Sequence, residues 1–120
     1  MLLKIFHSFR HAFRGMRFAY IHDKSFKIEV WATPLVVFFA WYFWPLTSTE
    51  VLFLALGVSL IYITELVNTA FERALEKIHP ERHELIGKSK DIASSAVLVA
   101  VFYTALVILV ILLSHFGMLP

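Results

Sequence analysis

Three strongly apolar stretches alternate with polar segments along this chain of 120 residues. They run from about 30 to 46, from 51 to about 67 and from 92 to 113. A helix needs roughly 17–25 predominantly apolar residues to cross a bilayer, and each stretch reaches or approaches that length. Pro34 lies near the start of the first stretch, which is also the shortest. The pattern predicts three transmembrane helices.

The first twenty residues follow a different pattern, with apolar side chains recurring every three or four positions. These side chains are Leu2, Phe6, Phe9, Phe13, Met16 and Tyr20. Basic residues and histidines fill much of the remainder, so we expect an amphipathic helix in the membrane surface, near anionic headgroups. A presequence-like helix is the alternative, but three spans would already anchor the chain.

Composition supports a membrane protein of the all-α class. The chain is 59% hydrophobic and 17% charged, whereas soluble chains are about 45–50% apolar and about 25% charged. We expect a single membrane domain, with a surface helix and turn over residues 1–28. Helices containing the spans should follow at about 30–46, 51–79 and 91–115, the second ending near His79-Pro80.

The basic residues predict an orientation. All 11 Lys and Arg fall between Lys4 and Lys27 or between Arg73 and Lys90. The positive-inside rule places the N-terminus and the second connection in the cytoplasm, and the C-terminus on the periplasmic side. Aromatic residues at 41–44 would form an interfacial belt at the far end of the first span.

Several polar side chains lie on the predicted second span, where lipid offers them no hydrogen bonds. They are Ser59, Thr64, Glu65, Asn68 and Thr69. Three short spans cannot cover them all, so we expect a homo-oligomer.

The same span carries the strongest candidate chemistry. Glu65, Asn68 and Glu72 have the spacing i, i+3 and i+7, which places them on one stripe of a helix. Glu65 follows an uncharged run that begins at Val51. A carboxylate there is costly unless it is paired, protonated or facing a polar cavity, which favours a functional role for Glu65.

Further acids lie close to the predicted cytoplasmic boundary, beside Lys90. They are Asp23, Glu29, Glu72 and Asp91. Hard oxygen ligands suit Mg²⁺, which is usually held by one or two carboxylates and substrate phosphates. Phosphoryl transfer needs such a metal, a cation on the phosphates and a base for the attacking hydroxyl. Simple pairing with interfacial Lys or Arg remains an equal interpretation for Glu72 and Asp91.

Two other motifs are weaker. Gly87-Lys88-Ser89 resembles the end of a Walker A loop, but Arg82 occupies the position of the required first glycine. His79 and His83 are four residues apart, but Pro80 disrupts the helix that would align them for zinc.

Two longer motifs together resemble the prokaryotic diacylglycerol kinase family, whose members are small trimeric membrane kinases. Glu65-x-x-Asn68-Thr69-x-x-Glu72 is similar to the family signature E-x-x-N-[ST]-x-x-E. The second motif, H-E-L-x-G-x-x-K-D-x-x-S-x-A-V-L, is matched over residues 83–98. The resemblance covers nearly the whole chain.

This resemblance implies a role for each matching residue. Glu65 would be the general base for the lipid hydroxyl, with Asn68 beside it, and Asp23 and Glu72 would hold the metal bound to ATP. The nucleotide would also meet Lys4, His11, Glu81, Arg82, His83, Lys90 and Asp91. The lipid would be bordered by Arg17 and its neighbours to Tyr20, by Glu29 and by Ser94.

Four positions depart from the best-known members. Asp23 replaces a glutamate, so its reach to the metal is shorter. His11 replaces a tyrosine and Lys4 an arginine, while Glu76 conservatively replaces an aspartate.

The implied reaction is the phosphorylation of diacylglycerol to phosphatidate by ATP and Mg²⁺ at the cytoplasmic face of a bacterial inner membrane, by a homotrimer. Undecaprenol, the substrate of a related Gram-positive branch, is the main alternative. A non-enzymatic membrane subunit or channel is a remote one, because its acids should spread through the spans. We expect no nucleic-acid partner.

Overall fold

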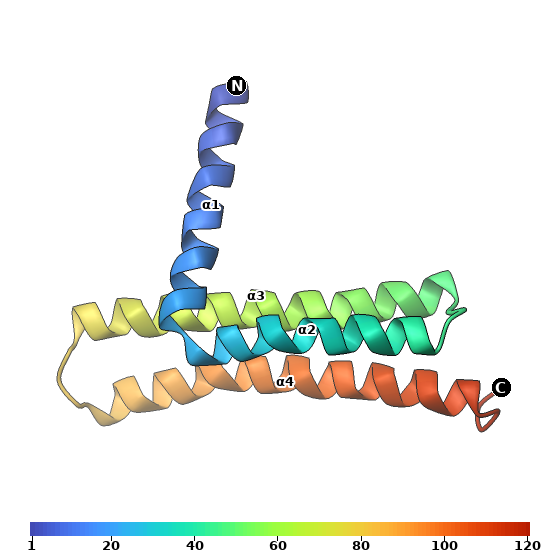
Figure 1. Ribbon diagram of the computed structural model, residues 1–120. Coiled ribbons are helices and arrows are strands. Elements are labelled where there is room, and N and C mark those ends of the chain that lie inside the picture. The colour runs from blue at the N-terminus through green and yellow to red at the C-terminus, as the bar shows by residue number, and fades with distance from the viewer.

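The computed structural model describes residues 1–120 as four α-helices without a strand (Figure 1). They are α1 (Leu2–His22), α2 (Lys24–Tyr42), α3 (Ser48–Ile78) and α4 (Glu84–His115). The last three lie side by side, and α1 projects away from them (Figure 1). The prediction of an all-α protein with an N-terminal helix is confirmed.

Short polar side chains fix where three of the helices begin. The Asp23 carboxylate accepts the Ser25 N–H at 3.0 Å and caps α2. The Thr47 hydroxyl accepts the Glu50 N–H at 3.1 Å and caps α3. His83 Nδ1 accepts the Leu85 N–H at 3.1 Å at the start of α4. Each cap satisfies a backbone donor that has no partner within its helix.

These caps explain why two predicted boundaries were wrong. The helix expected from about 30 begins at Lys24, so residues 24–28 belong to α2 and not to the surface unit. The helix expected from about 91 begins at Glu84. Both predictions started the helix where its apolar run begins, whereas capping lets the helix start in the preceding polar residues.

The prediction of three spans is confirmed for two helices only. α3 and α4 are long and apolar enough to cross a membrane. α2 does not meet the same test, because Lys24, Lys27 and Glu29 occupy its first turns and it ends at Tyr42 instead of at 46.

The apolar core lies at the end of the bundle where α2 joins α3 and where the chain ends (Figure 1). Leu46, Leu54 and Ile111 are buried there. The Phe43 ring lies 5.5 Å from the ring of His115, which brings the C-terminal end of α4 to the α2–α3 connection. The polar residues described next lie toward the other end of α3.

Candidate active site

Three polar side chains are buried on the face of α3 that meets the turn between α1 and α2. Glu65 is 4% exposed, and Asn68 and Thr69 are each 8% exposed. Their helical spacing places them on adjoining turns of one face. Buried polar groups need partners, and those of Thr69 and Glu65 come from the α1–α2 turn.

Asp23 supplies those partners. Its Oδ2 accepts the Thr69 hydroxyl, while its Oδ1 accepts the Ser25 N–H. The Glu65 carboxyl lies beside the Asp23 carboxyl, and Glu29 and Glu72 lie nearby. Asp23, Glu29, Glu65 and Glu72 therefore form a loose carboxyl cluster, contributed by α2, α3 and the turn between α1 and α2.

Asn68 lies at the edge of this face that borders α4. Its Nδ2 donates to Glu72 Oε1 at 3.5 Å, while its buried Oδ1 has no partner. A groove of about 300 Å³ between α3 and α4 is lined by Asn68 and Ser89. The unpaired amide oxygen gives the site an additional hard acceptor.

The backbone of Glu29, in α2, is bonded to a side chain of α3. Its carbonyl accepts the Thr33 hydroxyl at 2.9 Å and the Tyr62 hydroxyl at 3.4 Å, and the two hydroxyls bond each other. The side-chain Oε2 of Glu29 is buried and unpaired. These contacts fix the start of α2 against α3 one turn before Glu65.

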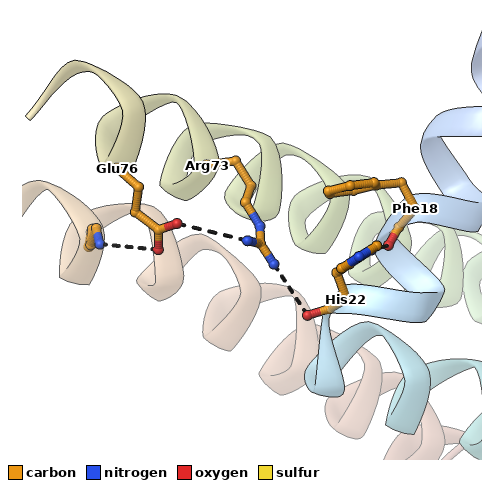
Figure 2. A network of polar contacts seen from close by, with 5 residues as sticks. Phe18, His22, Arg73 and Glu76 are labelled. Atoms are coloured by element: carbon orange, nitrogen blue, oxygen red, sulfur yellow. Dashed lines mark hydrogen bonds and ion pairs between the residues drawn. The ribbon is translucent and has the colours of Figure 1, made fainter. Parts of the chain in front are cut away.

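Lys90, on α4, pairs with Glu76 on α3, one turn beyond Glu72. Its Nζ lies 3.7 Å from Glu76 Oε1, and Glu76 also lies 3.9 Å from the Arg73 guanidinium. Figure 2 shows Arg73 continuing the network to His22 at the end of α1. Glu76 thus joins cations from α3 and α4.

The remaining predicted residues are exposed and are not brought to the carboxyl cluster within one chain. On α1 and α4 they are Lys4, His11, Arg17, Asp91 and Ser94. In and beside the α3–α4 connection they are Glu81, Arg82 and His83. His83 caps α4 instead of facing the cluster.

Sequence reasoning gave no site role to Thr69, Tyr62 or Thr33. Thr69 entered as a polar residue needing a partner and as a position of the family signature, and Tyr62 lies one turn before Glu65 on α3. That spacing is the one signal that could have found Tyr62. Thr33 carried no signal, because its partners belong to a distant helix.

The donors at the cluster suit magnesium better than a transition metal. No group of three His, Cys, Asp or Glu side chains forms a closed metal centre. Carboxylate oxygens of Asp23 and Glu72 and the free amide oxygen of Asn68 are hard ligands. Mg²⁺ typically uses one or two such carboxylates and completes its shell with water and phosphates.

Comparisons with known proteins identify the family of the chain. The family model for prokaryotic diacylglycerol kinase matches residues 10–112. The chain belongs to the prokaryotic diacylglycerol kinase family. The chain is therefore a lipid kinase associated with a bacterial membrane, as the sequence motifs predicted.

Individual relatives cover most of the chain. Diacylglycerol kinase of Escherichia coli (strain K12) is 36% identical over 107 residues, which are 89% of this chain and 87% of the relative. That of Haemophilus influenzae is 27% identical over 106 residues, 88% of this chain and 89% of the relative. That of Synechocystis is 35% identical over 101 residues, 83% of this chain and 57% of the relative.

Proposed function

We propose that this kinase transfers the γ-phosphoryl group of ATP to the free hydroxyl of 1,2-diacylglycerol. The hydroxyl oxygen forms a bond to phosphorus, the bond to the β-phosphate oxygen breaks, and the products are phosphatidate, ADP and a proton. The reaction would occur at the cytoplasmic face of the inner membrane.

The observation that carries this proposal is the buried Glu65 carboxyl, 4% exposed, beside Asp23 at the end of an apolar helical run. A diacylglycerol hydroxyl lies at the level of the headgroups. A base that accepts its proton must therefore lie near the end of a span, within reach of both lipid and water. Glu65 lies near the end of the apolar run of α3, and Asn68 lies one turn away on the same face.

An apolar hollow beside the cluster would accommodate the lipid. A hollow of about 550 Å³ between α1 and α3 is lined mostly by apolar side chains, with Thr69 and Arg73 at its polar edge. Arg17, Glu29 and Ser94 would border the lipid from the neighbouring helices.

The nucleotide would approach from the polar end of α3. Asp23 and Glu72 would hold Mg²⁺, which neutralises phosphate charge when bound. Lys90 would leave Glu76 to meet the phosphates, because an exposed ion pair is weak enough to exchange partners. Asp91, Glu81, Arg82 and His83 would contribute from α4 and the loop.

The carboxyl cluster and the basic residues lie toward one end of the molecule, and the C-terminus lies at the other. We place the basic end in the cytoplasm and the C-terminus in the periplasm. A homotrimer would cover the large exposed apolar surfaces of α3 and α4 and would complete the site with Lys4 and His11 from a neighbouring α1.

The direct test is phosphorylation by radiolabelled ATP in mixed micelles containing diacylglycerol or undecaprenol. The Glu65→Gln variant keeps the side-chain volume but cannot accept a proton. We expect it to assemble and bind ATP while losing about 10²–10⁴-fold in turnover.

Glu50→Gln is the matched control, because it makes the same change at the opposite end of α3. It should keep near-normal turnover. A Glu65→Gln enzyme with near-normal rates would remove Glu65 from the role of base, and faster turnover of undecaprenol by the wild type would replace diacylglycerol as the substrate.

A further inference from the structure

Arg73 joins three parts of the molecule that sequence analysis treated separately. Its guanidinium donates to the carbonyl of His22 at 3.4 Å and lies 5.6 Å from the centre of the Phe18 ring. It also lies 3.9 Å from Glu76. Figure 2 shows the planar group lying between the last turn of α1 and Glu76.

The contact with α1 has favourable electrostatics. His22 is the last residue of α1, where carbonyl groups lack helical partners and the helix dipole is negative. A guanidinium both satisfies such a carbonyl and stacks on an aromatic ring, which an ammonium does less well. The ion pair between Arg73 and Glu76 is half-exposed and therefore weaker than the contact with α1. Glu76 accordingly orients the guanidinium, and the end of α1 is the part of the molecule that Arg73 holds in place.

The position of this contact determines the position of Asp23. Asp23 directly follows His22, and its side chain accepts the Thr69 hydroxyl. Thr69 and Arg73 lie four residues apart on α3. That helix therefore holds the α1–α2 connection at two adjacent points, the His22 carbonyl and the Asp23 side chain. An aspartate has a single methylene, so the reach of its carboxylate depends on where its backbone lies.

We propose that Arg73 is a positioning residue that clamps the α1–α2 turn onto α3 and thereby sets the reach of the Asp23 carboxylate. This inference rests on the proposed function, in which Asp23 is a ligand of the nucleotide-bound magnesium. Glu76 extends the same network to Lys90, so one carboxylate orients both the clamp and the cation assigned to the phosphates.

Hydrogen–deuterium exchange of the metal-free protein tests the clamp directly. Arg73→Met keeps the apolar stem and removes the guanidinium. We expect amide exchange in residues 20–26 to rise about 3–10-fold, because the turn opens locally more often. Arg73→Lys should give an intermediate rise, and exchange within the core of α4 should not change.

Lys77→Met is the matched control, since Lys77 lies one turn farther along α3 and forms no ion pair. Exchange in residues 20–26 that is the same for Arg73→Met and Lys77→Met would overturn the clamp.

The Mg²⁺ dependence of the kinase rate tests the positioning. Arg73→Met should raise the Mg²⁺ concentration for half-maximal activity several-fold and leave the KM for diacylglycerol unchanged. In the double variant Arg73→Met/Asp23→Glu, the longer side chain should restore the wild-type Mg²⁺ requirement. Such rescue is a non-additive effect that general destabilisation would not produce.

An unchanged Mg²⁺ requirement in Arg73→Met, or a double variant worse than Arg73→Met alone, would overturn the positioning role. A wild-type protein that phosphorylates no lipid alcohol would overturn the proposed function, and the exchange experiment would still decide the clamp.

Discussion

At the scale of single residues, the Thr69 hydroxyl is the contact that ties Asp23 to α3. Thr69→Val keeps the shape of the side chain and removes this donor. A hydrogen bond to a charged group contributes about 1.5–3 kcal/mol, so we expect Asp23 to lose its orientation and the Mg²⁺ requirement to rise. Mg²⁺ titration of the kinase rate measures the effect.

Two substitutions serve as controls for this prediction. Thr69→Ser retains the hydroxyl and should behave like the wild type. Thr49→Val makes the same chemical change at an exposed position near the start of α3 and should have no effect. Superimposable Mg²⁺ curves for Thr69→Val and the wild type would show that the hydroxyl does not position Asp23.

The residue scale also shows what sequence reasoning can find. Glu65, Asn68 and Glu72 were identified because helical spacing alone places them on one stripe, and the structure keeps them there. Arg73 was noted only as part of a basic segment. Its significance comes from contacts with α1, which no local pattern encodes.

At the scale of helices, α3 and α4 lie very close together at Gly57. A Cβ added there would lie 2.6 Å from Thr104 Oγ1 and 3.2 Å from its Cβ. Thr104 is 5% exposed and donates to the Ala100 carbonyl, so it has little room to move. Small residues at such crossings let membrane helices pack closely.

We therefore expect Gly57→Ala to lower the free energy of unfolding by about 1–3 kcal/mol through overpacking. Adding Thr104→Ala should recover part of this loss, because it removes the nearest atom. Thermal or SDS-induced unfolding in micelles measures both. Gly87→Ala is the control, since a Cβ there meets nothing within 4 Å. Equal stability of Gly57→Ala and the wild type would contradict the close crossing.

The helices themselves were predicted better than their ends. Periodicity and apolar length identify all four segments, but Asp23 and His83 start α2 and α4 earlier than hydropathy suggests. The same extension brings charged residues into α2, which is why it does not meet the criterion for a span.

At the scale of the whole molecule, a single chain covers little of itself. Only 11 of 120 residues are buried, and large apolar side chains are exposed along α3 and α4. In the proposed homotrimer, lipid and further copies of the chain would cover this surface. α1 also projects away from the other helices (Figure 1), with Lys4 in its first turn and His11 near its middle. Both residues therefore lie away from the carboxyl cluster of their own chain.

If α1 of one protomer completes the site of another, two inactive variants should complement each other. We expect Lys4→Met and Lys90→Met to be impaired alone. Random co-assembly should restore about a quarter of the sites, because each restored site needs one intact Lys4 and one intact Lys90 from different chains. Kinase activity of the co-refolded mixture measures this recovery.

Two parallel mixtures make the result decisive. Lys90→Met mixed with Glu65→Gln should recover nothing if these two residues belong to one chain's share of the site. Lys4→Met mixed with wild type should keep about half of the sites intact whether or not sites are shared, so it calibrates the activity per intact site. Activity of the Lys4/Lys90 mixture equal to the average of the two variants would show that sites are not shared in this way.

The sequence by itself determined the helical class, the apolar helices, the lipid kinase family and the stripe from Glu65 to Glu72. Each of these depends on spacing within about twenty residues, and hydropathy and helical period act over that range. The tertiary structure decided which groups meet. Thr69 and Asp23 are 46 positions apart, and Arg73 contacts the end of α1 only because the turn after His22 folds back onto α3.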